Sequence, residues 1–401
     1  MINLEEPKRY RGLTEQAHQV ALEVFRPVSR RYDLAEHEYP KELDTLAALL
    51  DGMNAGAEEA AGIGELNHKQ STDDGVVNGR TMAAVLSMTE LCWGDVGLAL
   101  SLPRQGLGNA AISAVANDEQ AERFKGCWAA MAITEPGAGS DSAAITTRAV
   151  EDGDDFVLNG EKIFVTAGGR CDTVVVWATL DPKAGRAAIK SFVIPKGTPG
   201  MEVVRLDHKM GIRASDTASI RLTDCRVPKE NLLGSREIDT KRSFAGVMKT
   251  FDNTRPLVAA MAIGLARASL EETRRLLGQA GIEIDYQRPA AAQSAAAAAF
   301  MELEADWEAA RLLTLQAAWM ADNNQPNSLH ASMAKAKAGR MGAAVTLGCI
   351  ELIGPAAYGE DSLLEKWARD AKILDIFEGT QQIQLLIIAR RLLGKTSSEL
   401  R

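Results

Sequence analysis

Residues 131–142 read MAITEPGAGSDS, and this short segment decides how the rest of the chain is interpreted. An apolar run, residues 130–133, leads into it and predicts the end of a β-strand. Pro136, Gly137 and Gly139 then interrupt the strand and predict an exposed loop with bare backbone N–H groups, little of which suits a hydrophobic core. Such a loop can approach a flat polar ring or a phosphate closely, although an ordinary strand-to-loop corner has the same composition.

The composition is that of a globular protein. Of its 401 residues, 46% are hydrophobic and 25% charged, enough for two or three domains and a large core. The net charge of −9 and the lack of a long basic run argue against nucleic acid or an anionic membrane as the main partner. No apolar run reaches membrane-spanning length, and the N-terminal MINLEEPKRYRG has no apolar signal segment, so a cytoplasmic location is expected.

The cysteines and histidines form no metal-binding or catalytic motif. The cysteines lack CxxC spacing and predict reduced, mostly buried side chains. They are Cys92, Cys127, Cys171, Cys225 and Cys349. The five histidines are equally dispersed, so the sequence supports neither a Ser-His-Asp triad nor a histidine metal site, and no metal is expected.

Helical spacing dominates residues 1–126, the expected N-terminal helical domain. The segments with this spacing are 13–32, 39–50, 82–98 and 110–116. Asn117 is expected to cap a further helix. Residues 52–79 are rich in glycine and alanine and predict a long loop with helical fragments.

Alternating apolar residues replace this spacing in residues 127–240 and predict a compact antiparallel β-domain. The short β-rich runs are 144–150, 156–158, 162–166, 173–180, 191–195, 201–207 and 218–222. Asn159-Gly160 lies between two of these runs and is the strongest hairpin signal in the chain.

Helical patterns return in residues 241–401. The long helical segments are 243–277, 290–320, 329–353 and 380–393. Pro256 predicts a kink in the first of them or a join between two helices. Long antiparallel helices of this kind form a four-helix bundle. The predicted fold class is therefore α+β, with an N-terminal helical domain, a middle antiparallel β-domain and a C-terminal four-helix bundle.

TEPGAGSD, in the opening segment, resembles the first signature of the acyl-CoA dehydrogenase family, and NGEKIFVT, residues 159–166, is similar to its second. The resemblance implies an FAD site lined by Ile133, Thr134, Gly139 and Ser140. It also implies that Ser140 reaches the acyl-CoA, that Phe164 lies against the flavin in place of the usual tryptophan, and that Thr166 hydrogen-bonds the ring. Taken alone, Phe164 is better interpreted as a core residue of a hairpin.

A third similar segment is FDNTRP, residues 251–256. The resemblance places Asp252 and Arg255 near the acyl-CoA, whereas Arg255 taken alone is more commonly a surface residue. Arg213 and Asp216, within MGIRASDT, match a family segment near the CoA entrance.

The fourth similar segment, RDAKILDIFEGT at residues 369–380, is the one that implies the chemistry. The resemblance makes Glu378 the base that removes the α-proton of the thioester. The flanking residues that it places at the substrate or the flavin are Phe377, Gly379, Thr380 and Gln382. Taken alone, Glu378 is a solvated acid ahead of a helix capped by Thr380. The family's other location for the base corresponds to Thr254, which cannot serve.

The resemblance implies FAD-dependent α,β-dehydrogenation of an acyl-CoA to the trans-2-enoyl-CoA, with hydride transfer to flavin N5 and an electron-transferring flavoprotein as partner. Burial of Glu378 beside an acyl chain and Phe377 is expected to raise its pKa. Two alternatives stay open: a same-fold acyl-CoA oxidase or monooxygenase, and a non-catalytic subunit of a heteromeric dehydrogenase. The sequence leaves the length and branching of the acyl chain open.

Two segments depart from the family pattern. In homomeric members, an Arg-x-x-Phe-Gly and a Gln-x-x-Gly-Gly-x-Gly segment complete the FAD site of a neighbouring subunit. Here an ungapped count puts Glu283 at the arginine position and Tyr286-Gln287 at Phe-Gly, while the second segment reads ELIGPAA, with Glu351 and Pro355. Because a carboxylate repels a pyrophosphate, we expect a tetramer, of the α2β2 type if a related chain supplies the arginine. A register shift that brings in Arg288 is the alternative.

Overall fold

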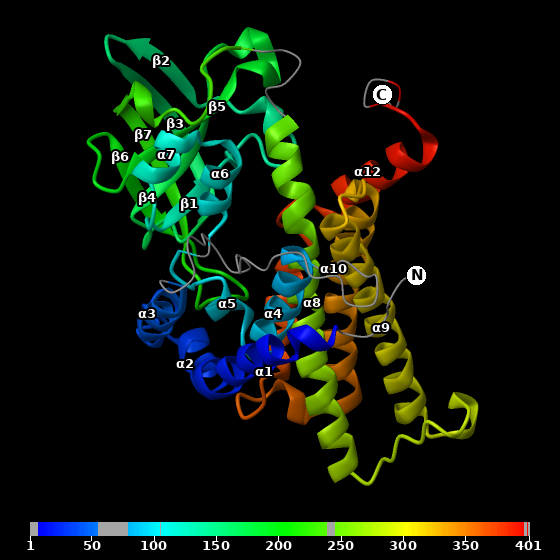
Figure 1. Ribbon diagram of the computed structural model, residues 1–401. Coiled ribbons are helices and arrows are strands. Elements are labelled where there is room, and N and C mark those ends of the chain that lie inside the picture. The colour runs from blue at the N-terminus through cyan, green and yellow to red at the C-terminus, as the bar shows by residue number, and fades with distance from the viewer. Residues whose placement is uncertain (1–6, 55–78, 105, 239–244, 397–398, 400–401) are drawn as a thin grey trace.

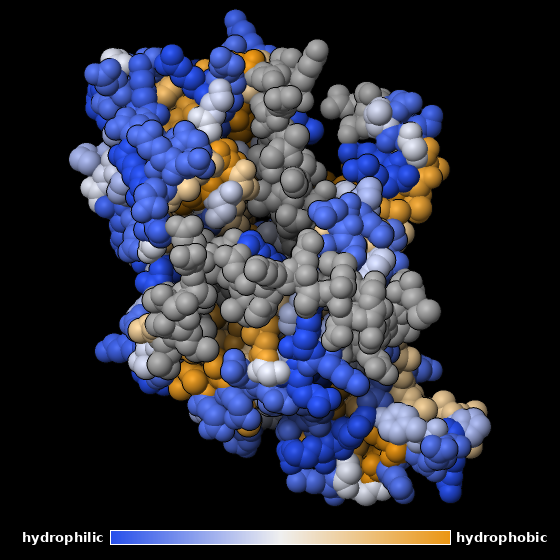
Figure 2. Space-filling view, in the orientation of Figure 1, coloured by the Kyte–Doolittle hydropathy of each residue, from blue (hydrophilic) through white to orange (hydrophobic). Residues whose placement is uncertain are grey.

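The computed structural model describes residues 7–54, 79–104, 106–238, 245–396 and 399, with the backbone alone for 49–54 and 245–253. A sheet domain lies at one end of the molecule, and helices from both ends of the chain lie against each other beside it (Figure 1). The face drawn in Figure 2 is mostly hydrophilic, with apolar patches over the sheet domain and on α12. The order of helical, sheet and helical parts confirms the predicted α+β class.

The N-terminal part is helical, as predicted. Its helices are α1 (Arg11–Val20), α2 (Arg26–Leu34), α3 (Glu42–Asn54), α4 (Arg80–Gly94), α5 (Val96–Ala99), α6 (Leu107–Val115) and α7 (Asp118–Arg123). A π-helical turn, Ala21–Phe25, joins α1 to α2. Pro27 follows this turn and has no N–H to donate, which favours the wider turn there. The predicted long loop overlaps α3 up to Asn54, and its residues 55–78 lie outside the described residues.

The predicted cap of α7 is confirmed. The Asn117 side chain accepts a hydrogen bond from the backbone N–H of Gln120, and the Gln120 side chain accepts one from the N–H of Asn117. This reciprocal pair is a capping box. All five cysteines are free, and all except the half-buried Cys127 are buried, as expected.

Seven strands form one sheet in the order β1-β4-β2-β3-β7-β6, with β5 paired to β4. The strands are β1 (Ala129–Ala132), β2 (Arg148–Asp152), β3 (Asp155–Thr166), β4 (Thr173–Thr179), β5 (Ile189–Pro195), β6 (Met201–Leu206) and β7 (Thr217–Pro228). Most pairings are antiparallel, as predicted, but β4 pairs in parallel with β1 and β2, which the sequence did not indicate. Every residue of β4 is buried, as expected for a central strand covered on both faces.

The predicted hairpin at Asn159-Gly160 is wrong. Both residues lie inside the continuous strand β3, and the turn that joins β2 to β3 is Gly153-Asp154. Asn159 exchanges hydrogen bonds with Asp224 of β7 at 3.1 and 2.9 Å, beside an irregularity in the strand pairing. A Cβ at Gly160 would lie 2.4 Å from Thr147 Oγ1, just before β2, so glycine permits a close approach here instead of a reversal.

The C-terminal part contains the predicted long helices. They are α8 (Ala245–Gln279), α9 (Ala295–Asp322), α10 (Ser328–Ile353), α11 (Leu364–Ala371) and α12 (Gln381–Leu393). Pro256 lies within α8, which continues through it, so the predicted join between two helices is wrong. By length and composition the stretch Ser328–Tyr358, α10 with the 3-10 turn after it, can cross a membrane, with a mean hydropathy of 1.3, so the expectation that no apolar run reaches that length is wrong. In the structure α10 packs against α8 and α9 inside the bundle.

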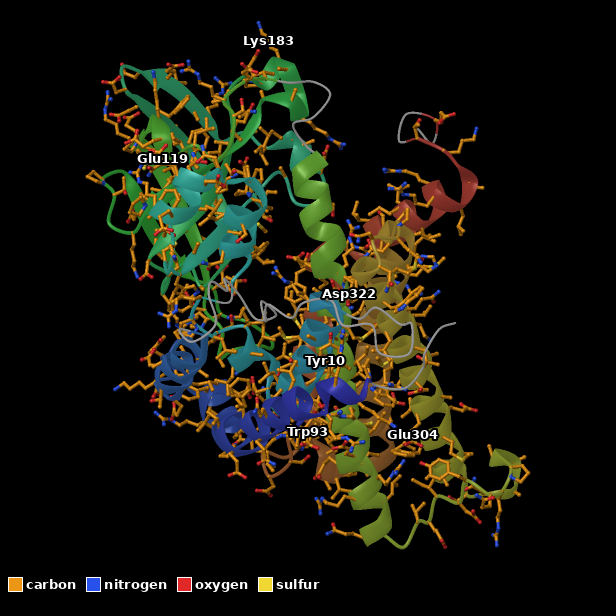
Figure 3. All side chains as sticks on the ribbon, in the orientation of Figure 1. Tyr10, Trp93, Glu119, Lys183, Glu304 and Asp322 are labelled. Carbon is orange, nitrogen blue, oxygen red and sulfur yellow. The ribbon has the colours of Figure 1, made fainter. Side chains whose placement is uncertain are left out.

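One hydrophobic core joins the two helical parts. It contains Phe25 and Leu98 from the N-terminal helices and Leu265, Phe300 and Met341 from the bundle. Asp322, at the C-terminal end of α9, strengthens this junction: its carboxylate accepts hydrogen bonds from the N–H groups of Gly79, Thr81 and Met82 at 2.7–3.0 Å (Figure 3). A carboxylate at the start of α4 satisfies free N–H groups and stabilises the helix dipole.

Candidate active site

The segment between α11 and α12 presents Glu378. A 3-10 turn, Lys372–Asp375, follows α11, and Thr380 begins α12 as its cap by accepting a bond from the N–H of Ile383. Glu378 has φ 56° and Gly379 has φ 95°. Positive φ is natural for glycine, whereas a glutamate there is strained and is held only by its surroundings. The chain therefore bends at the residue predicted to be the base.

Glu378 is half-buried, and its carboxyl group makes one short contact. Thr254 Oγ1, on α8, donates a hydrogen bond to Glu378 Oε2 at 2.8 Å. Burial raises the pKa of Glu378, while the Thr254 hydrogen bond and the charges of Arg255 and Lys335 act in the opposite direction. The interpretation of Glu378 as a solvated acid is wrong. A desolvated carboxylate with a raised pKa is a stronger base than one in water.

Lys335, on α10, holds the turn that carries Glu378 and was not identified from the sequence. Its side chain is fully buried, and Nζ donates to the carbonyl oxygen of Gly379 at 2.7 Å. Gln384 Nε2 donates to the carbonyl oxygens of Glu378 and Gly379 at 3.2 and 3.1 Å. Burial lowers the pKa of Lys335 to about 8. The one sequence signal was a lysine among the small residues of AKAKAG.

A second buried network holds α11, which precedes this turn. Lys366 Nζ donates to Asp95 at 2.7 Å and to Asp370 at 2.6 Å, and all three side chains are buried. Asp370 also accepts from the N–H of Ile212, in the loop between β6 and β7, at 2.5 Å. These contacts connect α5, α11 and the sheet domain, so the position of the catalytic turn depends on all three parts of the chain.

The first two motifs meet at a buried ion pair. Lys162 Nζ donates to Glu135 Oε1 at 2.7 Å and to the carbonyl oxygen of Ile133 at 3.1 Å. Glu135 also accepts four bonds from the N–H and hydroxyl groups of Thr146 and Thr147 at 2.6–3.0 Å. These contacts outweigh the effect of burial and lower the pKa of Glu135 to about 2. Glu135 is thus buried and holds the opening segment in place, although the sequence predicts an exposed loop directly after it.

The residues predicted at the flavin lie beside this pair. The N–H of Ile163 donates to the carbonyl oxygen of Thr134 at 2.9 Å, which places the two motifs side by side. Phe164 is 63% exposed and has φ 58°, so its interpretation as a buried hairpin residue is wrong. Thr166 is half-buried, and Gly139 and Ser140 are exposed. A Cβ built on Gly139 meets no atom within 4 Å, so the loop presents open backbone.

The residues predicted to lie near the acyl-CoA are found in different surroundings. Arg255 is buried, not on the surface, and lies next to Thr254, while the side chain of Asp252 lies outside the described residues. Asp216 is buried and pairs with Arg170 at 3.4 Å, and Arg213 Nε donates to the carbonyl oxygen of Lys209 at 2.8 Å.

In the fourth motif, Phe377 packs against the helical core and Gln382 is exposed. The structure therefore gathers Thr254, Arg255, Lys335 and Glu378 in one place.

The segments that depart from the family pattern lie on the surface. Glu283 and Glu351 are exposed, and Pro355 lies in a 3-10 turn after α10. Tyr286 is 53% exposed and contacts Arg274 and Glu304. Arg288 and Asp285 form a pair at 3.2 Å, and no other described carboxylate is paired with Arg288.

A small cavity of about 200 Å³ lies elsewhere, between α4, α8 and α9. Val85 and Thr89, Ile263 and Arg267, and Trp307 contribute to its lining. Neither Glu378 nor any other predicted site residue lines it.

Comparison with known proteins identifies the family. The family model for the acyl-CoA dehydrogenase middle domain matches residues 130–225, and that for the C-terminal domain matches residues 244–393. The chain belongs to the acyl-CoA dehydrogenase family, whose members named among its relatives are enzymes.

Individual relatives agree with this assignment. The short-chain specific acyl-CoA dehydrogenase of Clostridium acetobutylicum is 34% identical over 318 residues, which cover 77% of this chain and 81% of that protein. The mitochondrial short-chain specific enzyme of Rattus norvegicus is 37% identical over 274 residues, but the match spans 67% of this chain and only 63% of the rat protein. The structure of butyryl-CoA dehydrogenase from Megasphaera elsdenii is similar with a TM-score of 0.82 and 27% identity, covering 98% of this chain and 100% of that one.

Proposed function

We propose that this protein is an FAD-dependent acyl-CoA dehydrogenase that converts an acyl-CoA thioester to the trans-2-enoyl-CoA, with Glu378 as the base. The observation that carries the proposal is the Glu378 carboxyl group, whose pKa is raised by desolvation and which accepts a hydrogen bond from Thr254 at 2.8 Å. Such desolvation of an acid is costly and is typical of a group that must take up a proton.

The residues of the first two motifs suit a flavin. Phe164 offers an exposed aromatic face next to a glycine loop that is open to close approach. We assign the ring to Ile133, Thr134, Phe164 and Thr166, and the remainder of the cofactor to Gly139, Ser140, Thr380 and Gln382. When bound, FAD supplies the acceptor for the hydride equivalent that leaves the substrate.

The chain's own residues prepare the proton transfer. Glu378 takes the α-proton, while Thr254 orients the carboxylate and Lys335 holds the turn through the Gly379 carbonyl oxygen. In this assignment the Glu378 backbone N–H binds the thioester oxygen, where negative charge develops. Arg255 is buried beside the base, where its charge supports the ionised carboxylate. Exclusion of water strengthens each of these electrostatic interactions.

We infer a short, unbranched acyl chain as the preferred substrate, because relatives over much of the chain are named short-chain specific and a similar structure is named butyryl-CoA dehydrogenase. Electrons would pass on to an electron-transferring flavoprotein, as the resemblance implies. A panel of straight and branched acyl-CoA thioesters of increasing length tests the substrate directly. A preference for long or branched chains would contradict this part of the proposal.

We also propose an oligomer built through the bundle. α12 exposes four leucines, Leu385, Leu386, Leu392 and Leu393, with 37–64% of their surface accessible. An exposed apolar face of this kind is typical of an interface. Glu283 in place of the family arginine favours an α2β2 tetramer with a related chain. Full FAD occupancy in a homotetramer of this chain alone would exclude the heteromeric assembly.

Anaerobic titration with butyryl-CoA separates the three candidate functions. Bleaching of the flavin absorbance indicates dehydrogenation, and rapid return of the colour in air indicates an oxidase or monooxygenase. A protein that binds no flavin, and so shows no colour, is a non-catalytic subunit. Glu378→Gln should keep FAD binding and abolish bleaching, because glutamine has the same shape without a basic oxygen. Full bleaching by the variant would exclude Glu378 as the base.

A further inference from the structure

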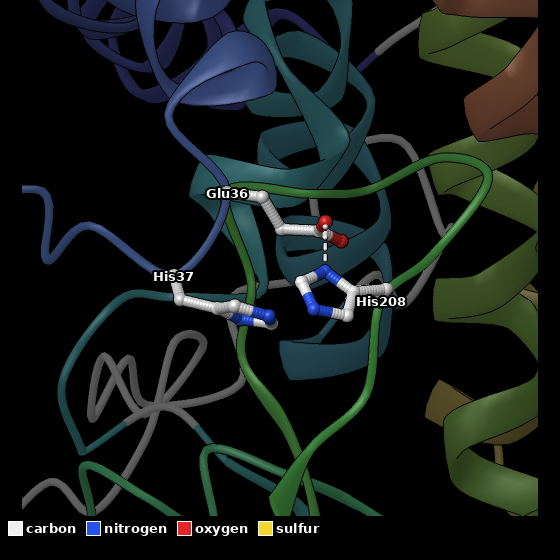
Figure 4. Close-up of side chains that lie close together, drawn as sticks. All are labelled: Glu36, His37 and His208. Carbon is white, nitrogen blue, oxygen red and sulfur yellow. Dashed lines mark hydrogen bonds and ion pairs between the residues drawn. The ribbon is translucent and has the colours of Figure 1, made fainter.

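Away from the catalytic turn, the structure brings Glu36, His37 and His208 together (Figure 4). Glu36 and His37 follow α2, whereas His208 lies in the loop of residues 207–216 between β6 and β7. Glu36 and His208 are 172 residues apart in the sequence. Each of the three side chains offers one ligand atom, and these atoms lie within 4.8 Å of one another. The dispersed spacing of the histidines along the chain gave no sign of this cluster.

Two of the three side chains are already held in place. His208 Nδ1 lies 2.9 Å from Glu36 Oε2, and the backbone N–H of Lys209 donates to Glu36 Oε1 at 2.7 Å. The carboxylate is thus fixed against the β6–β7 loop, and its side chain is only 14% exposed. A carboxylate beside an imidazole fixes the orientation of the ring.

His37 completes the cluster, and its ring nitrogens are unpaired among the described residues. Nδ1 and Nε2 are both buried, and neither has a hydrogen-bond partner among the described residues. The ring lies 5.0 Å from that of His208, measured between centroids, and faces it across the gap shown in Figure 4. The backbone of His37 has φ 73°, which is costly for a non-glycine residue and must be stabilised by its surroundings.

We propose that Glu36, His37 and His208 bind one divalent transition-metal ion of the Zn²⁺ type. Two imidazoles and one carboxylate suit such an ion, with water as the fourth ligand. In a tetrahedral zinc site the ligand atoms lie roughly 3.3 Å apart. The wider separations, which reach at most 4.8 Å, therefore have to close, while His208 Nδ1 and Glu36 Oε2, now 2.9 Å apart, exchange their hydrogen bond for bonds to the ion. His208 can make that adjustment, because its side chain is 84% exposed.

The positive charges of the nearby Lys209 and Arg170 are offset by the carboxylates of Glu36 and Asp216. Lys209 Nζ donates to the carbonyl oxygen of Ser215 at 2.5 Å, and Arg170 pairs with the buried Asp216 at 3.4 Å. Glu36 adds a negative charge at the site itself. The local charge is therefore close to balanced before a divalent ion arrives.

The bound ion would connect the N-terminal helices to the sheet domain. The same β6–β7 loop continues to Ile212, whose N–H donates to Asp370 on α11. An ion that binds the folded chain and not the unfolded one raises the melting temperature. Metal binding is thus expected to stabilise the junction of three structural parts, independently of the flavin.

Co²⁺ is a suitable probe, because its visible absorption reports tetrahedral coordination by protein ligands. Titration of the untagged, chelator-treated full chain should give one Co²⁺ per chain, displaced by Zn²⁺, and Zn²⁺ should raise the melting temperature. His208→Ala and Glu36→Gln should each weaken binding at least tenfold. His18→Ala is the matched control, because His18 pairs with the Glu90 carboxylate at 2.8 Å without a third ligand.

The outcomes are unambiguous because His208 is exposed, so its replacement does not disturb the core. Loss of the Co²⁺ spectrum in His208→Ala, with the spectrum kept in His18→Ala, supports the site. A spectrum unchanged in His208→Ala would place the ion elsewhere and overturn the proposal. Absence of stoichiometric binding by the wild-type chain would overturn it as well.

Discussion

Replacement of Thr254 by valine tests how the protein controls its proposed base. The hydroxyl donates to Glu378 Oε2 at 2.8 Å and favours the ionised carboxylate against the effect of burial. Valine has nearly the same shape but no donor. The pKa of Glu378, already raised by burial, should therefore rise further, and a larger share of the enzyme should be protonated and inactive at neutral pH.

The size of the effect follows from the hydrogen bond that is lost. A bond to a charged group contributes about 1.5–3 kcal/mol, which corresponds to a loss of roughly 10- to 100-fold in rate where the base is mostly protonated. The difference should shrink as the pH rises, because the base becomes ionised in both proteins. The sign is thus a loss at low pH and a recovery at high pH.

The assay is rapid anaerobic mixing of the flavin-loaded enzyme with butyryl-CoA over a range of pH. The rate of bleaching reports proton removal without the electron acceptor. Thr254→Ser keeps a hydroxyl at the same position and is the matched control, expected to show a pH profile close to that of the wild type. If Thr254→Val lowers the rate equally at every pH, the hydroxyl acts on geometry and not on ionisation, and the reasoning is refuted.

Three further predictions concern the buried charges. Glu378→Gln should raise the melting temperature at neutral and alkaline pH but not at acid pH, because the raised pKa of Glu378 means that stability is lost as the pH rises through it; an equal gain at all pH values would contradict this. Lys335→Met should slow bleaching roughly tenfold or more, because it removes a charged hydrogen bond to the catalytic turn. Lys337→Met, on the same helix, is the control and should leave the rate unchanged. Equal rates in the two variants would refute a positioning role for Lys335. Lys162→Met leaves the Glu135 carboxylate buried without its cation and should lower the free energy of unfolding, measured by denaturant titration, by about 3–5 kcal/mol. Adding Glu135→Gln should recover part of that loss. An unchanged free energy of unfolding in the single variant would show that the pair is dispensable.

Local patterns in the sequence were sufficient for the order of elements. Apolar spacing located the long helices, and Asn117 located a helix start, because caps and amphipathic faces depend on residues close in the chain. The same local rules failed at Asn159-Gly160. There the glycine permits a close approach to Thr147, just before β2, and the asparagine pairs with Asp224 of the distant strand β7.

The candidate site divides in the same way. Its motifs could be recognised in the sequence because each is a short run of consecutive residues. Glu378 was the one acid that matched the family's base. The sequence alone thus determined the fold class, the family resemblance and the candidate base. Only the tertiary structure decided that Thr254 hydrogen-bonds Glu378 and that the charge of the buried Lys335 acts on it. It also decided that Lys162 pairs with Glu135 and that the ring of His37 lies beside that of His208. Burial and charge pairing depend on which residues far apart in the sequence lie close together in the folded protein, and the spacing of residues along the chain does not specify those contacts.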